Sequence, residues 1–191
     1  MQKNANTSRI AVVNQAAGGN RILQDGFGPN ALGCIDRDVL AQSGVKYAMI
    51  FEGVNDIGTT DTTTAAQKLV GDQLISAFEQ IIMRVHTFGI PIFAATITPF
   101  SAPNSSDQPY SDPTREATRQ RVNTWILNSG AFDAVIDFDK IVRDPNIPSQ
   151  FSSKYNSGDY LHPNVANYQA ITDAFPLDIF SEFASGVSGL T

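Results

Sequence analysis

Cysteine, histidine and charged residues are scarce in this 191-residue sequence, which has one cysteine, two histidines and 17% charged residues. The lone Cys34 excludes an intrachain disulfide, and with neither a second cysteine nor a histidine nearby in the sequence it is a poor metal ligand. Because neutral imidazole is a usable base near pH 7, the two histidines, His86 and His162, are the candidates for that role.

Excess positive charge and long apolar runs are also lacking. Lys and Arg number 13 against 19 Asp and Glu, giving a net charge of -6 without a basic cluster, so nucleic acid is not an expected partner. No apolar run approaches the roughly 20 residues of a membrane span, and the opening "MQKNANTSR" lacks the apolar stretch of a secretory signal. No G-x-G-x-x-G occurs, and we expect no cofactor.

Hydrophobic residues make up 42% of the sequence, and no linker segment divides it. The sequence therefore predicts a single domain over residues 1–191. Four short apolar runs alternate with helical patterns. This alternation predicts an α/β fold with a parallel sheet covered by helices on both faces. The predicted strands are residues 10–14, 47–52, 92–97 and 134–138.

The connections between these runs have helical spacing of apolar residues. One helix is predicted to begin at Pro113, because Asp112 can cap it and proline suits the first turn. The predicted helices are residues 30–44, 74–85, 113–130 and 163–175. The longest polar stretch, residues 99–113, follows the third predicted strand, at the carboxyl edge where such sheets bind ligands.

Two strands are followed by segments that could stabilise an oxyanion. In "NQAAGGN", residues 14–20, the paired glycines permit a tight turn with free backbone amides, although for this segment alone a plain turn is the simpler explanation. In "FEGVNDIG", residues 51–58, the Asn55 amide could donate to charge that develops on a substrate oxygen. Alternatively, Asn55 and Asp56 serve only to cap a turn.

A third segment, "SGDYLHPN", residues 157–164, places Asp159 three residues before His162. A carboxylate bonded to one imidazole nitrogen fixes the tautomer of a histidine base. The alternative is a surface histidine near a helix start. For His86, at the end of a predicted helix, a favourable interaction with the helix dipole is a sufficient explanation.

Together, "NQAAGGN", "GVND" and "DYLHP" resemble in order and context the SGNH hydrolases, also called the GDSL esterases and lipases. The resemblance implies a flavodoxin-like three-layer α/β/α sandwich that hydrolyses a small-molecule or carbohydrate ester, as secreted microbial members do. It assigns Gly19 and Asn55 to the oxyanion site, His162 as the base and Asp159 as its orienting partner.

The nucleophile of that family lies in a Gly-Asp-Ser motif after its first strand, and the motif does not occur in this sequence. Only nine residues precede Ile10, too few for a strand and a crossover helix, so residues 10–14 correspond to the family's second strand. We therefore expect an N-terminally truncated chain without the first, internal strand. Closure of the sheet, a strand swap in a homo-oligomer or a separate peptide could fill the slot.

Other serines are weak substitutes, because a nucleophile must reach both the imidazole and the oxyanion donors. The serines considered are Ser101, Ser105, Ser106 and Ser157. We therefore expect an esterase that is impaired or inactive as this chain. Two alternatives stay open: a non-catalytic binding protein, and a metal-dependent hydrolase using three acids, Asp133, Asp137 and Asp139.

Overall fold

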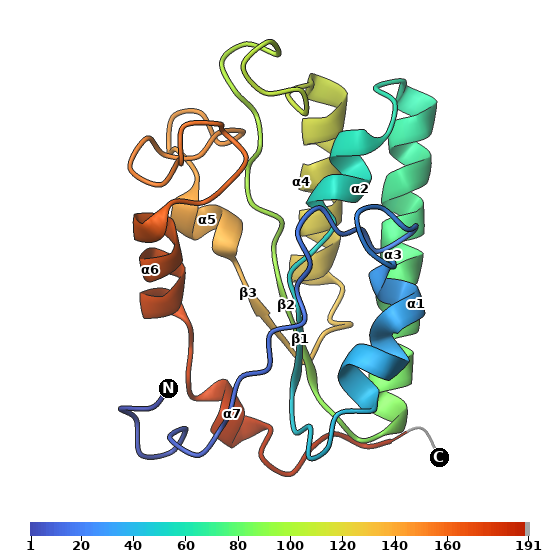
Figure 1. The fold of residues 1–191 in the computed structure, drawn as a ribbon, viewed down its shortest axis with the longest axis vertical. Coiled ribbons are helices and arrows are strands. Elements are labelled where there is room, and N and C mark those ends of the chain that lie inside the picture. The colour runs from blue at the N-terminus through green and yellow to red at the C-terminus, as the bar shows by residue number, and fades with distance from the viewer. Residues whose placement is uncertain (190–191) are drawn as a thin grey trace.

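Three parallel strands lie between two layers of helices (Figure 1). The structure is a computed structural model that describes residues 1–189. The strands β1 (Ala48–Ile50), β2 (Ile92–Ala95) and β3 (Ala134–Ile136) are arranged in the order β1-β2-β3, and both neighbouring pairs are parallel. The prediction of a parallel sheet covered on both faces is confirmed for these strands.

The two helical layers use opposite faces of the central strand. On β2, Ile92 and Ala94 belong to one buried apolar cluster, whereas Phe93 and Ala95 belong to the other. Because successive side chains of a strand point to opposite faces, a strand buried on both sides is apolar at every position. The sequence of β2, "IFAA", has this property.

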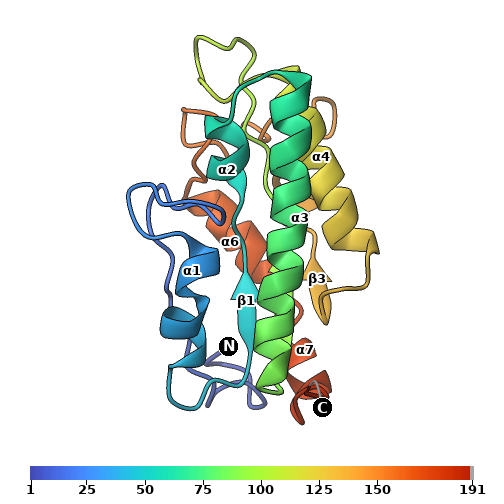
Figure 2. The ribbon, with the colours of Figure 1, turned by 90° about the vertical axis from the view of Figure 1, so that its right-hand side faces the viewer.

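On one side of the sheet lie α1 (Ala31–Ile35), the π-helix η1 (Asp36–Leu40), α2 (Val54–Thr59), α3 (Thr64–Thr87) and α4 (Pro113–Asn128). On the other side lie α5 (Phe138–Val142), α6 (Val165–Ala174) and α7 (Ile179–Glu182). Figure 2 shows α1 and α3 beside β1. No helix within residues 1–189 is both long and apolar enough to cross a membrane.

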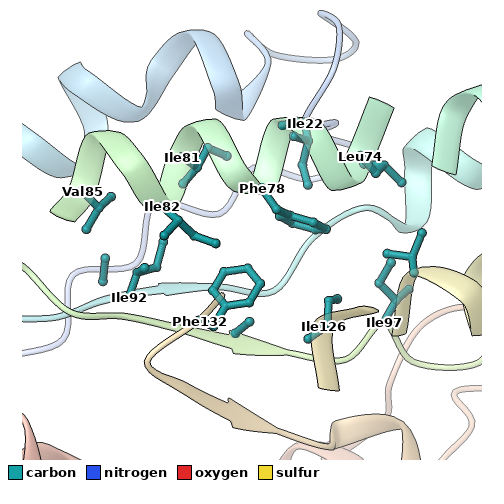
Figure 3. Packing of buried hydrophobic residues seen from close by; sticks show 14 of the residues in the cluster. Ile22, Leu74, Phe78, Ile81, Ile82, Val85, Ile92, Ile97, Ile126 and Phe132 are labelled. Atoms are coloured by element: carbon teal, nitrogen blue, oxygen red, sulfur yellow. The ribbon is translucent and has the colours of Figure 1, made fainter. Parts of the chain in front are cut away.

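The long helix α3 forms most of the larger core. Its apolar stripe lies against β2 and the segments that follow β2 and α4 (Figure 3). The predicted stripe is confirmed, since all five of its members are buried: Leu74, Phe78, Ile81, Ile82 and Val85. The predicted start of α4 is also confirmed, because the Asp112 side chain accepts the N–H of Thr114 at 2.8 Å.

The prediction of a strand at residues 10–14 is wrong. Residues 10–17 have no regular secondary structure, and residues 11–19 are exposed. Within residues 1–189, no backbone hydrogen bond joins this segment to β1. An apolar run forms a strand only where another strand pairs with it, and none does so here.

A buried guanidinium connects α4 to the segments after β2 and β3. Arg119 is fully buried; its Nη1 donates to the Ile97 carbonyl at 2.8 Å and to Asp139 Oδ1 at 2.5 Å. Its Nε and Nη2 donate to the two carboxylate oxygens of Glu116 at 2.8 and 2.7 Å. Asp139 also accepts from Arg143 at 2.7 Å. This network fixes the chain where it leaves the carboxyl edge of the sheet.

We expect Asp139→Ala to lower the free energy of unfolding by about 3–5 kcal/mol, because it leaves a buried guanidinium without one of its partners. Urea titration followed by circular dichroism measures the change. As a control, Lys68→Ala removes an exposed partner of Asp72 and should cost at most ~1 kcal/mol. Equal losses for the two variants would show that the buried network does not stabilise the fold.

Candidate active site

The turn that carries Asp159 and His162 connects α5 to α6 and is closed by its own hydrogen bonds. An isolated bridge pairs Asn156 with Pro163. The Asn156 Oδ1 accepts the N–H groups of Gly158 and Tyr160, each at 2.9 Å. Gly158 and Tyr160 both have positive φ, 112° and 60°, and the asparagine contacts support this conformation. The turn therefore holds the Asp-x-x-His pair in a defined geometry.

The Asp159 carboxylate is surrounded by donors. Its Oδ2 lies 2.5 Å from the His162 Nδ1, while Oδ1 accepts the N–H groups of Leu161 and His162 and the Ser157 hydroxyl at 2.8–3.0 Å. Partial burial favours the neutral acid, but the hydrogen bonds from His162, Leu161 and Ser157 outweigh it and hold the pKa of Asp159 well below its usual range. The His162 side chain is 70% exposed, so its ring is accessible.

Asn55 lies in the first turn of α2, directly after β1. Gly53 before the helix has φ 118°, a conformation that favours glycine. The Asn55 Nδ2 donates to the Asn20 carbonyl at 2.8 Å, and its Oδ1 accepts the Tyr110 hydroxyl at 3.2 Å. These two contacts fix the orientation of the amide group and place it beside the residue that follows Gly19.

The loop that contains Gly19 is fastened to α2 by Asp56. The buried Asp56 carboxylate accepts the N–H groups of Ile22 and Leu23, each at 3.0 Å. Burial raises the pKa of Asp56, and these two N–H groups oppose the rise. Gly19 has φ +73°, and a Cβ there would lie 2.3 Å from the Phe27 ring, so glycine is required by both conformation and space.

A continuous chain of hydrogen bonds connects Asn55 to the Asp159–His162 pair. The Tyr110 hydroxyl binds Asn55, and the Tyr110 N–H donates to the Gln108 Oε1 at 3.1 Å. The buried Gln108 then donates through Nε2 to the Asp159 carbonyl at 2.8 Å. The four predicted site residues thus lie in two groups, Gly19 with Asn55 and Asp159 with His162, joined by this path.

Gln108 and Tyr110 were not singled out from the sequence. Both belong to the 99–113 segment, which was predicted to lie at the carboxyl edge of the sheet as a polar loop. An aromatic residue and a long amide in a polar loop at that edge are the signal that could have identified them, since both can donate hydrogen bonds.

None of the considered serines has a hydroxyl bonded to the imidazole of His162. Ser101 is buried, whereas Ser105 and Ser106 are exposed. Ser157 donates to Asp159 and not to His162. Within residues 1–189, the Asp159 carboxylate is the one hydrogen-bond partner of the His162 ring.

The three acids considered as metal ligands do not form a cluster. Asp133, before β3, binds the His86 Nε2 at 2.8 Å, so that histidine has a specific structural partner. Asp137 caps α5 at the other end of the strand, and Asp139 is paired with arginines. Within residues 1–189, no group of three His, Cys, Asp or Glu side chains could hold a metal ion.

Glu52, two residues after β1, contrasts with Asp159. Its Oε1 is buried and has no hydrogen-bond partner in the described part of the chain. Burial raises the pKa of Glu52 to about 7, and the nearby Asp56 carboxylate adds to the rise. This carboxyl group lies three residues before Asn55, on the segment that enters the site.

A hollow of about 520 Å³ lies beside α3 and reaches Leu32 of α1, Asp56 of α2 and Thr60. Its lining includes Leu32, Leu69 and Gln73, but none of Gly19, Asn55, Asp159 or His162. The hollow therefore borders the candidate site at Asp56 without containing the four predicted residues. We place the candidate site at the hydrogen-bonded groups, because a base and oxyanion donors are needed for catalysis and an open groove without them is not sufficient.

Comparison with known proteins identifies relatives of this chain. The profile of the family described as GDSL-like Lipase/Acylhydrolase matches residues 1–175. A solved Streptococcus pneumonia protein whose description names platelet activating factor has a TM-score of 0.59 and 18% identity; the match covers 80% of this chain and 65% of that one. A GDSL-like lipase from Bacteroides thetaiotaomicron VPI-5482 has a TM-score of 0.54, with 13% identity and coverages of 81% and 69%.

At these identities the two structures show the shared fold alone. The chain spans 65% of the length of the Streptococcus pneumonia protein. No curated protein matches the sequence.

We expect the pKa of Asp159, measured by carboxyl ¹³C NMR, to lie below the ordinary value of about 3.9. His162→Ala should raise it, because the variant removes the imidazole donor and leaves the backbone donors in place. His86→Ala, which changes the histidine paired with Asp133, is the matched control and should leave the Asp159 titration unchanged. An unshifted Asp159 in the unmodified chain would contradict the hydrogen-bonded geometry.

Glu52 should make stability depend on pH. Its folded-state pKa of about 7 exceeds the unfolded value of about 4.3, so the folded state binds the proton more tightly. Stability should therefore fall as pH rises between those values and then stay level. Urea denaturation at several pH values should show that Glu52→Gln reduces this fall, whereas Glu79→Gln, at an exposed position on α3, does not.

Proposed function

Because the chain belongs to the GDSL-like lipase/acylhydrolase family, we propose that it carries the acid–base and oxyanion groups of an ester hydrolase of the SGNH type. The observation that carries the proposal is the 2.5 Å contact between the Asp159 carboxylate and the His162 Nδ1. A carboxylate on one ring nitrogen leaves the other nitrogen to take a proton from a nucleophile.

His162 acts as the base in this proposal, and Asp159 holds its tautomer and stabilises the imidazolium. The donor shell of Asp159 supports this role, because it keeps the carboxylate ionised beside a ring that becomes positive. The exposure of His162 supports access by a reacting group. The substrate class is a small-molecule or carbohydrate ester.

The Gly19 backbone N–H and the Asn55 amide form the proposed oxyanion site. One Asn55 N–H donates to the Asn20 carbonyl, and the second, which has no partner within residues 1–189, can donate to a substrate oxygen. The Tyr110 hydroxyl donates to the Asn55 Oδ1, and this bond fixes the direction in which the amide N–H groups point. Donors fixed before the substrate arrives are the requirement for this kind of stabilisation.

We place the nucleophile on a segment outside these 191 residues, in a strand that would complete a flavodoxin-like sandwich beside β1. Support comes from His162, whose ring has no hydroxyl partner within residues 1–189. On this proposal the chain alone is an impaired or inactive esterase. The same observation favours one alternative, a non-catalytic protein that binds an ester or sugar or associates through a strand swap; calorimetry showing binding without turnover would support it.

The 191-residue chain should hydrolyse p-nitrophenyl acetate weakly or not at all. Without a nucleophile, the oxyanion donors and the base would accelerate hydrolysis about 10³–10⁴-fold over the reaction in water, far less than a full triad does. Adding an upstream Gly-Asp-Ser segment should raise kcat by orders of magnitude. In that extended protein, His162→Ala should abolish the gain, and Asn55→Ala should lower kcat by roughly 10²–10³.

His86→Ala is the matched control for His162→Ala and should leave kcat of the extended protein near its starting value. A full esterase rate from the 191-residue chain, with covalent labelling by a fluorophosphonate, would contradict the absence of a nucleophile. Mapping the labelled serine would then identify it.

A further inference from the structure

Two arginines bind the C-terminal end of α2, about one turn after Asn55. The Arg21 Nη1 donates to the Thr59 hydroxyl at 3.3 Å. The Arg115 Nε and Nη2 donate to the Thr60 carbonyl at 3.2 and 2.8 Å. Cations at this end of a helix interact favourably with its dipole, so part of their role is structural.

Arg21 lies beside the proposed oxyanion donors. It directly follows Asn20, whose carbonyl accepts the Asn55 N–H. Residues four apart share one face of a helix, so Thr59 lies on the Asn55 face of α2, about 6 Å along the axis. The Thr59 hydroxyl donates to the Asn55 carbonyl at 2.6 Å, and Figure 2 shows the loop that precedes α1 beside α2. The Arg21 guanidinium can therefore reach a group a few bonds away from an ester carbonyl held at Asn55.

The Tyr110 side chain connects both arginines to the site. Its ring packs on Gly58, where a Cβ would lie 2.1 Å from the Tyr110 Cδ2. Burial raises the pKa of Tyr110, and the charges of Arg115 and Arg21 oppose the rise. Both positive charges therefore act at the hydroxyl that orients the oxyanion amide.

Within residues 1–189, neither of these two arginines forms an ion pair. The arginines that do so are Arg37, Arg119, Arg121 and Arg143. Two acids, Asp25 and Asp56, lie near Arg21, but each carboxylate already accepts two other N–H groups. Arg21 donates instead to neutral oxygens, the Thr59 hydroxyl and the Asp25 carbonyl. In a chain with a net charge of -6, this leaves two cations at one site able to bind an anion.

We propose that Arg21 binds a carboxylate carried by the ester substrate and that Arg115 adds positive potential at the same place. The inference rests on the proposed function, because it takes the ester carbonyl to lie at Gly19 and Asn55. A guanidinium has five N–H donors in a fork that fits a carboxylate, and Arg21 uses two of them within the chain. The substrate class narrows to esters with a carboxylate a few bonds from the scissile bond, on the acyl or the alcohol side.

Binding to the 191-residue chain, which requires no nucleophile, tests the inference. The probes are two isomeric anions: monomethyl succinate has its carboxylate on the acyl side, and 3-acetoxypropanoate has it on the alcohol side. Their neutral isosteres are methyl succinamate and 3-acetoxypropanamide. Each compound is titrated at constant ionic strength by ¹H–¹⁵N NMR, with the Asn55 and Tyr110 resonances as the readout. We expect at least one anion to bind about tenfold more tightly than its isostere, and which anion does so identifies the side.

Variants of the two arginines should change this preference for the anion over its isostere. Arg21→Gln should remove most of it, and Arg21→Lys should retain part, since lysine keeps the charge without the fork. Arg115→Gln should have a smaller effect, because three N–H groups of Arg115 are already bonded to carbonyl oxygens. Arg84→Gln is the matched control and should leave the preference unchanged, since Arg84 also forms no ion pair within residues 1–189 and donates to the Leu32 carbonyl.

No detectable binding of any probe, equal binding of the anions and their isosteres, or an equal loss in Arg84→Gln would overturn the inference. An Arg21→Gln variant that loses the anion and the isostere alike would also overturn it, because Arg21 would then only hold α2 in place. An arginine-dependent preference without hydrolysis by the chain extended with a Gly-Asp-Ser segment would uphold the carboxylate site and count against the proposed function. Hydrolysis of p-nitrophenyl acetate by that extended protein, with no preference for either anion, would do the reverse.

Discussion

The Asp56 carboxylate is the contact on which the candidate site depends. Residues 10–17 have no strand partner, so nothing in a sheet fixes the approach of the chain to Gly19. The two N–H groups of Ile22 and Leu23 that bind Asp56, together with burial of Ile22 in the core, fix it instead. Because Asp56 neighbours Asn55 in α2, the same contact sets the position of one proposed oxyanion donor relative to the other. Burial of a carboxylate costs free energy, and the two donors offset that cost at the place where positioning matters.

Sequence patterns within single segments predicted the parts of this fold that depend on short-range contacts. The apolar stripe of α3, the Asp112 cap of α4 and the Asp-x-x-His spacing all follow from contacts between residues close in sequence. The segment 10–14 has the same apolar character as β1, but a strand is stabilised by neighbouring strands, and no pattern within the segment shows whether a neighbour exists. The contacts of Gln108 with Asp159, and of Tyr110 with Asn55, join residues about fifty apart, so they follow from the tertiary fold alone.

Two carboxyl groups near the proposed site have opposite environments. Asp159 accepts from an imidazole, two backbone N–H groups and a hydroxyl, and these donors stabilise its charge although the residue is partly buried. Glu52 has a buried oxygen without a donor and an acid as its neighbour, so burial dominates and favours the neutral form. Pairs of acids whose environments move their pKa values apart are characteristic of functional sites. Here the difference separates a carboxylate whose donors are present from one whose buried oxygen has no donor within residues 1–189.

The hydrogen-bond path from Asn55 through Tyr110 and Gln108 to Asp159 explains how the site can be ordered without a nucleophile. The amides of Asn55 and Gln108 each use both of their polar atoms, and Tyr110 contributes its hydroxyl and its backbone N–H, so orienting one group constrains the next. Asn55 and Asp159 are therefore positioned by the loop 99–112, not by contact with a serine. A catalytic residue placed by such a scaffold keeps its geometry when another member of the site is absent. On this argument, the Asp159–His162 turn keeps its orientation whichever segment supplies the nucleophile.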